Sequence, residues 1–151
     1  MKAIAPSAIR LYDRPSAEFD SRVAHAVSAL KAAAIEHPGR IVQSTSLGVE
    51  DMVVTDLIAR HHVAVKLSTL NTGMLHAQTV DLIARIESRY QLSVQVFEPV
   101  VEAAIHFVRL NGERAMFNSL ALRKACCGIR KMEPLSRMLN AQTAWVTGLR
   151  R

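Results

Sequence analysis

The chain has 151 residues, of which 50% are hydrophobic and 5% aromatic, and its formal net charge is +6. This composition predicts one folded domain with a substantial core and excludes general disorder. No run approaches the roughly 18 apolar residues that a bilayer-spanning helix needs, so no membrane partner is expected. The first residues lack the apolar core of a signal peptide, and the sequence therefore predicts a cytoplasmic protein with reduced thiols.

Helical and extended patterns alternate along the chain. Residues 1–15 are predicted to be a loose lead-in to a domain over residues 16–151. The helical patterns cover residues 16–36, 47–62 and 76–90, and a mainly helical region covers 103–140. The extended patterns cover residues 41–46, 63–70 and 92–98, with a fourth strand expected in TAWVTGLRR at 143–151. This alternation predicts parallel β-α-β units, so the expected fold class is α/β with a parallel sheet flanked by helices.

Apolar residues repeat with a helical period in the first two helices, which predicts the faces that meet the core. Ser16 is expected to cap the first helix, with Glu18 in its first turn. The expected core-facing positions are Phe19, Val23, Val27 and Leu30 in the first helix, and Val49, Met52, Val53 and Leu57 in the second.

Loops beyond the carboxyl ends of parallel strands are where ligands bind in such sheets. The first loop offers the hydroxyls of Ser44 and Ser46, the close backbone approach that Gly48 permits, and a helix N-terminus. These features suit a phosphate or sulfate group. Glu50 and Asp51 favour the helix dipole, yet they would repel an anion unless turned aside. On this segment alone, a simple capped helix is the more economical interpretation.

The second strand ends at Asn71, Thr72 and Gly73, which favour a turn and could face a nucleotide. Further on, Cys126 and Cys127 are adjacent within a cluster of positive charges. A disulfide between neighbours would be strained, while nearby cations favour thiolates. Two thiolates are half of a ligand set for zinc or an iron–sulfur cluster, but on spacing alone buried inert cysteines are the better interpretation.

Four segments, in this order, resemble the assimilatory adenylyl-sulfate reductases of the phosphoadenylyl-sulfate (PAPS) reductase family. They are TSLGVEDMVVTDLI, TLNTGMLHAQT, FVRLNGERAMFNSLALRKACCGIRKMEPLSRML and WVTGLRR. The resemblance covers most of residues 43–151, and CCGIRKMEPL is its most specific block. It implies a fold of the adenine-nucleotide hydrolase-like type with a modified pyrophosphate (PP) loop.

The resemblance also implies roles for individual residues. Cys126 and Cys127 would be two ligands of a [4Fe–4S] cluster, and Lys131 would lie between cluster and phosphosulfate as the catalytic cation. The implied substrate-binding residues are Ser44, Ser46, Gly48, Glu50, Asp51, Leu70, Asn71, Thr72, Gly73, Arg130, Gly148, Arg150 and Arg151.

The implied activity is thioredoxin-dependent reduction of adenylyl sulfate to sulfite and AMP. In this family a C-terminal cysteine thiolate attacks sulfur and forms an enzyme thiosulfonate, from which thioredoxin releases sulfite. Adenylyl sulfate and thioredoxin are thus the expected partners, and a homo-oligomer is compatible with the sequence.

This chain departs from the family pattern in three ways. Asn71 stands where the family usually has Asp, and Met74 where it has Arg. The second cysteine pair and the terminal Cys-Gly-x-His segment fall beyond Arg151. We therefore expect an incomplete, C-terminally truncated domain that does not turn over alone.

Other functions are compatible with parts of the sequence. A 3′-phosphoadenylyl-sulfate reductase shares the motifs, and an ATP pyrophosphatase shares the fold, although Leu47 fills the first glycine position of its loop. A third interpretation is a catalytically inactive nucleotide-binding fragment. Nucleic acid is not expected as a partner, because basic residues concentrate only at 123–137 and 150–151 and no aromatic platform accompanies them.

Overall fold

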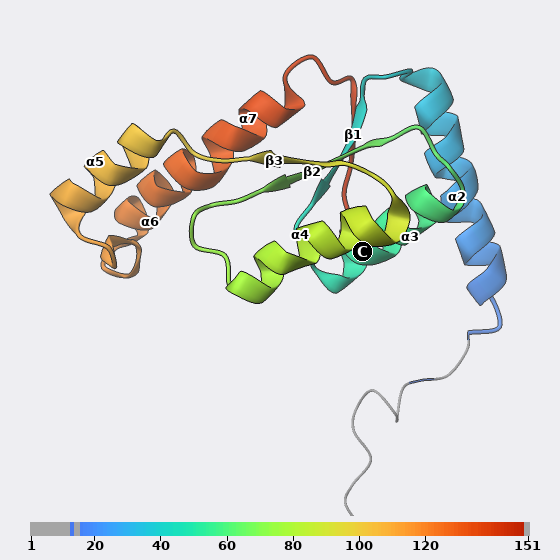
Figure 1. The fold of residues 1–151 in the computed structure, drawn as a ribbon, viewed down its shortest axis with the longest axis horizontal. Coiled ribbons are helices and arrows are strands. Elements are labelled where there is room, and N and C mark those ends of the chain that lie inside the picture. Colours follow the sequence, from blue (N-terminus) through green and yellow to red (C-terminus); the bar gives the residue numbers. More distant parts are fainter. Residues whose placement is uncertain (1–12, 14–15, 150–151) are drawn as a thin grey trace, which may run out of the picture.

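The computed structural model describes Asp13 and residues 16–149, which alternate between helices and strands (Figure 1). The strands are β1 Ile41–Thr45, β2 Lys66–Leu70, β3 Val94–Phe97 and β4 Ala144–Val146. The helices are α2 Phe19–Glu36, α3 Val49–Arg60, α4 Ala77–Tyr90, α5 Val101–Asn111, α6 Leu120–Cys127 and α7 Glu133–Leu139. Two short elements complete them, the 3₁₀-helix η1 Ala115–Phe117 and the π-helix η2 Gly128–Met132.

The four strands form one parallel sheet in the order β3-β2-β1-β4, which confirms the predicted α/β class. The chain moves outward from β1 to β2 and β3, then crosses back to place β4 on the other side of β1. Strand order therefore reverses between β1 and β4. In open α/β sheets, ligands bind in the crevice outside the carboxyl ends of the strands at such a switch point.

The main core lies between the sheet and helices α3 and α4, and α2 closes one end of it. Ile41, Ile58 and Ile86 are almost fully buried there. Burying one such side chain contributes about 1.5–3 kcal/mol. Helix α7 packs against β2 and β3, on the side of the sheet away from α3 and α4 in Figure 1. The sheet is thus covered by helices on both faces.

Residues 101–139 are mainly helical and are called the helical unit below, and a smaller cluster packs together part of this unit, within residues 107–129. The buried members of the cluster are Phe107, Ala115 and Cys126, and Leu122 and Ile129 pack beside them. This unit lies beside the sheet at the left of Figure 1, beyond the end of β3. Cys126 is therefore a core residue of a small cluster as well as half of the cysteine pair.

The predicted core face of α3 is wrong at two positions. Val49 is 79% exposed and Val53 57% exposed, whereas Met52 and Leu57 are half-buried. The buried face carries Asp51, Thr55 and Ile58 instead.

A polar network explains this choice of face. Gln43 in the middle of β1 is fully buried. Its amide donates to the Asp51 carbonyl oxygen over 2.9 Å and accepts a hydrogen bond of 3.1 Å from the Thr55 hydroxyl. Leaving the buried Gln43 amide without partners would cost about 1–3 kcal/mol of stability. The polar side of α3 therefore packs against β1.

The first helix begins later than expected. Ser16 accepts a hydrogen bond from the Glu18 amide over 3.2 Å, but α2 starts at Phe19 without a side-chain cap. Phe19 is 59% exposed, while Val27 is buried as predicted. No helix in the described part of the chain is long and apolar enough to cross a membrane.

Candidate functional site

The loop between β1 and α3 has the geometry of an anion site. Gly48 is the residue before the helix and, as a glycine, makes no side-chain cap to the helix N-terminus. The Ser46 hydroxyl instead accepts from the Gly48 amide over 3.2 Å, and Leu47 adopts the left-handed region with φ 62°. The alternative of a simple capped helix is thus not what the structure shows. Uncapped first-turn amides are the groups that hold phosphate and sulfate.

Asp51 is turned away from that helix end and into the protein. Its side chain is buried, and its two carboxylate oxygens accept from the amides of Ser46, over 2.6 Å, and of Gly148, over 2.7 Å. These bonds tie the loop after β1 to the loop after β4, across a sequence separation of 97 residues. The Asp51 carboxylate therefore joins the two loops that border the crevice at the switch point.

Gly148 makes this approach possible. A Cβ atom there would lie 2.6 Å from an Asp51 carboxylate oxygen, 2.7 Å from the Asp51 amide nitrogen and 2.8 Å from the Glu50 carbonyl carbon. Two of these atoms belong to backbone, so no rotamer change relieves the clash. Only glycine fits.

These two loops border a cavity of about 450 Å³, which we call the cradle. Five predicted substrate-binding residues line it: Ser44, Ser46, Glu50, Asp51 and Gly148. Sequence reasoning missed Trp145 and Thr147, which also line the cradle from β4 and the loop that follows. The signal for them was their position just before Gly148. Arg150 and Arg151 lie outside the described residues.

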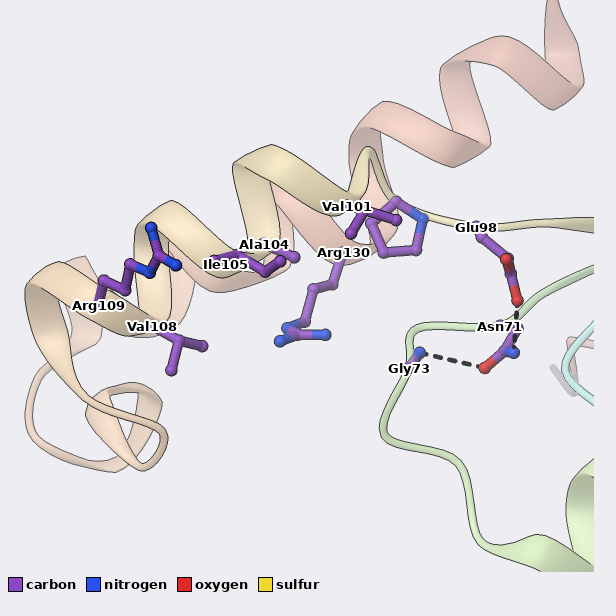
Figure 2. Close-up of a pocket in the computed structure, with 10 residues that line it drawn as sticks. Asn71, Gly73, Glu98, Val101, Ala104, Ile105, Val108, Arg109 and Arg130 are labelled. Carbon is purple, nitrogen blue, oxygen red and sulfur yellow. Dashed lines mark hydrogen bonds between the residues drawn. The ribbon is translucent and has the colours of Figure 1, made fainter.

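The loop after β2 forms a tight turn of its own. The Asn71 side-chain oxygen accepts from the Gly73 amide over 3.1 Å, and its amide nitrogen donates to Glu98 over 2.8 Å (Figure 2). The Asn71 backbone amide also donates to the Phe97 carbonyl. Asn71 thus joins the ends of β2 and β3. An aspartate at this position would place a second carboxylate against Glu98, whereas the side-chain amide of Asn71 donates a hydrogen bond to it.

Arg130 reaches the same loop from the helical unit. Its guanidinium donates to the Thr72 carbonyl over 2.7 Å. Figure 2 shows Arg130 projecting between α5 and the loop at Gly73, where it lines a cavity of about 340 Å³ with an apolar wall that includes Ile105. The contact to Thr72 fastens the β2 loop to the helix that bears the cysteines. Leu70, at the end of β2, is half-buried.

A third cavity, of about 380 Å³, brings the cysteines together with positive charge. We call it the cysteine cavity. Cys126 is 6% exposed, Cys127 is half-buried, and both are free thiols. The residues that line it include Thr72, Arg123, Cys126, Cys127, Arg130 and Lys131. Lys131 is exposed and forms no ion pair with any described residue. The cavity thus places two thiols among three cationic side chains.

The donor set fits half of a four-thiolate iron–sulfur site. A [4Fe–4S] cluster takes four cysteine thiolates, and the sequence contains two cysteines. Within the described residues no group of three or more His, Cys, Asp or Glu side chains could hold a metal ion. Cys126 and Cys127 face one cavity, so both can contribute to a cluster only if further thiolates join them.

The cradle and the cysteine cavity lie at the same edge of the sheet. Strands β1 and β2 pair in register up to Thr45 and Thr69. The loops that follow them, which carry Ser46 and Thr72, therefore leave the sheet side by side. The predicted site residues that the structure describes thus come from segments far apart in sequence but lie around the carboxyl ends of β1, β2 and β4.

A parallel sheet with a cavity at its switch point is the arrangement in which open α/β proteins bind their ligands. Residues 40–151 match the family model described as the phosphoadenosine phosphosulfate reductase domain. The chain therefore belongs to the PAPS reductase family, which confirms the resemblance stated from the motifs.

Three curated relatives, each named adenosine 5′-phosphosulfate reductase, are similar to the chain. The relative from Neisseria meningitidis serogroup A is 45% identical over 72% of this chain and 45% of its own length. The relative from Allochromatium vinosum is 43% identical over 73% of this chain and 43% of its own length. The Burkholderia cepacia relative is 41% identical over 83% of this chain and 50% of its length. The chain thus spans about half the length of the curated relatives it matches.

A solved structure shares the fold. The crystal structure of phosphoadenylyl-sulfate reductase from Candida auris, a phosphate complex, superposes with a TM-score of 0.70. The match covers 91% of this chain and 70% of that one, at 22% sequence identity. At this identity the likeness supports the fold alone.

Proposed function

We propose that this chain is the nucleotide-binding part of an adenylyl-sulfate reductase, acting in the cytoplasm during sulfate assimilation. The observation that carries the proposal is the cradle, where an uncapped helix end and Gly148 meet while Asp51 is turned inward. The names of the relatives support adenylyl sulfate over its 3′-phosphorylated form.

The proposed reaction is a transfer of the sulfo group to a thiolate. The thiolate attacks sulfur, the bond from sulfur to the bridging oxygen breaks, and that oxygen leaves with AMP. Reduced thioredoxin then attacks the sulfur attached to the enzyme in the resulting thiosulfonate, supplies two electrons as a dithiol and releases sulfite. The amides of the cradle would hold the phosphate that accepts the leaving electron pair.

Cys126 and Cys127 are the proposed cluster ligands, and a [4Fe–4S] cluster would supply fixed negative charge that orders the site. Since both cysteines of the chain are then used, the attacking thiolate and two further ligands must come from outside these 151 residues. Lys131 lines the same cavity without a described partner, so its charge is available to hold the sulfo group near that negative charge.

Calorimetric titration of the chain with AMP, adenylyl sulfate and 3′-phosphoadenylyl sulfate tests the proposal. We expect saturable binding of the first two and weaker binding of the third. Asp51→Asn should weaken binding at least tenfold, because an amide cannot accept from both Ser46 and Gly148.

The matched control for this test is Asp56→Asn on the same helix. Asp56 bonds Tyr90 and Arg60 and lies outside the cradle, so this variant should bind normally. Absence of saturable AMP or adenylyl sulfate binding would contradict the proposal. Preferential binding of ATP with pyrophosphate release would favour an ATP pyrophosphatase instead.

A further inference from the structure

The helix that bears the cysteines contains a π-turn. Helices α6 and α7 are joined by η2 without a break and lie in line in Figure 1. The Glu133 amide donates to the Gly128 carbonyl, five residues back, whereas an α-helix spans four. Such a turn holds one residue more than the α-helix around it. It is usually a local feature with an identifiable cause.

Pro134 supplies that cause. It is the second residue of α7, and its side chain is less than 2% exposed. In a continuous α-helix its ring would clash with the carbonyl of Arg130, and that carbonyl would lose its amide partner. The wider turn before Pro134 gives the carbonyl room. Because the ring is packed, it cannot swing outward to relieve the clash in another way.

Helix α7 is held to the sheet. Arg137 bonds Glu133 over 2.6 Å, donates to the Glu98 carbonyl and lies over the Phe97 ring. Met138 is 3% exposed. These contacts fix α7 on the end of β3, so any change in the length of the turn must rotate the segment that precedes it.

That segment carries the cysteine pair. One residue in a helix corresponds to about 100° of rotation and about 1.5 Å of rise. With the π-turn in place, Cys126 meets Phe107 and Ala115 in the small cluster, and Arg130 reaches the Thr72 carbonyl. A straightened helix would turn Cys126 out of the cluster and withdraw Arg130 from the loop.

We propose that Pro134 is a positioning residue, which maintains the π-turn and thereby sets which way Cys126, Cys127 and Arg130 face. The inference rests on the proposed function only for the roles of these residues in binding a cluster and the substrate. The arrangement itself is a property of the chain and is measurable without substrate, thioredoxin or cluster.

Site-resolved alkylation tests the proposal. The chain is treated with iodoacetamide at fixed pH, and mass-spectrometric fragmentation of the tryptic peptide Ala125–Arg130 gives the modified fraction at each cysteine. Wild-type protein should react mainly at Cys127, because Cys126 is buried. In Pro134→Ala, which restores the missing amide, the ratio of Cys126 to Cys127 modification should rise at least tenfold.

Two further variants separate the turn from general destabilisation. Pro134→Val keeps buried apolar volume but also restores the amide, so it should raise the ratio as Pro134→Ala does. Met138→Ala removes a buried side chain from the same helix and should lower Tm while leaving the ratio within twofold of wild type. The proposal is overturned if Pro134→Val retains the wild-type ratio, or if Met138→Ala raises it as much as the proline variants.

These outcomes are independent of nucleotide binding. Normal binding of AMP by the cradle together with an unchanged alkylation ratio would reject the role of Pro134 and leave the proposed function standing. The reverse result would reject the proposed function and keep the positioning role.

Discussion

The cradle and the cysteine cavity lie at the same sheet edge but are built differently. The cradle is closed by partly buried hydrogen bonds, which the Asp51 carboxylate accepts from the amides of Ser46 and Gly148 in the loops that follow β1 and β4. The cysteine cavity belongs to a small cluster whose buried members number three, and it offers thiols and cations without a complete ligand set. The chain thus contains a cavity closed by hydrogen bonds beside a cavity that holds two of the four thiols of the proposed cluster site.

The largest expected effect tests whether the two regions are separable. Phe107→Ala removes the main side chain of the small cluster and should destabilise the helical unit by about 3–5 kcal/mol. We expect faster hydrogen exchange throughout residues 101–132 and alkylation of Cys126, measured by mass spectrometry.

The control for this prediction is AMP binding. The cradle is built on β1, α3 and β4, so its affinity for AMP should change less than threefold in Phe107→Ala. Loss of AMP binding in parallel with exchange would show that the chain is one cooperative unit, and the distinction between the two regions would fail.

The next largest effect concerns closure of the cradle. Gly148→Ala places a Cβ against the Asp51 and Glu50 backbones and should destabilise the protein by about 1–3 kcal/mol. It should also abolish measurable AMP binding, because the loop after β4 must move outward. Thermal unfolding and calorimetry check both.

Gly128→Ala is the matched substitution in the helical unit. Its Cβ would meet nothing within 4 Å, and Gly128 has helical dihedral angles. This variant should keep AMP affinity and keep or slightly raise Tm. Equal losses in both glycine variants would mean that the clash at Gly148 is not what matters.

Sequence patterns predicted the sheet and its strand ends well, since alternation and family motifs are local signals. They failed where a distant partner decides. Val49 and Val53 fit the helical period, yet the buried Gln43 on β1 selected the opposite face of α3. The inward turn of Asp51 likewise depends on Gly148, 97 residues away, which no spacing rule reveals.

The helical unit shows the same limit. A mainly helical region was predicted over 103–140, but not the π-turn inside it, because Pro134 reads as an ordinary helix start. Because α7 is fixed to β3, the wider turn before Pro134 sets the direction of the segment that precedes it. The roles assigned to Lys131, Arg130 and the cysteines stay predictions, and their gathering around shared cavities is what the structure adds.

A smaller effect is expected at the joint between β2 and β3. Asn71→Asp replaces a donor to Glu98 with a second carboxylate and should cost about 1 kcal/mol, from the lost hydrogen bond and the new repulsion. Glu98→Gln in the same chain should restore most of the loss, since a neutral amide can donate to the new carboxylate. Denaturant unfolding of the single and double variants measures the coupling. Additive losses would show that Asn71 and Glu98 do not interact.

The smallest effect tests how the helical unit is tied to the sheet. The hydrogen bond from Arg137 lowers the pKa of Glu133 below its usual range. The carboxylate form is therefore favoured in the folded protein, so its contribution to stability is present above the unfolded pKa and is lost as pH falls through the folded pKa. The pair is exposed, so salt should weaken it. We expect Glu133→Gln to lose slightly less Tm than wild type between pH 5 and pH 3 at low salt, with the difference gone at high salt. The same acid response in both proteins would mean that Arg137 is held by Glu98 and Phe97 without help from the Glu133 carboxylate.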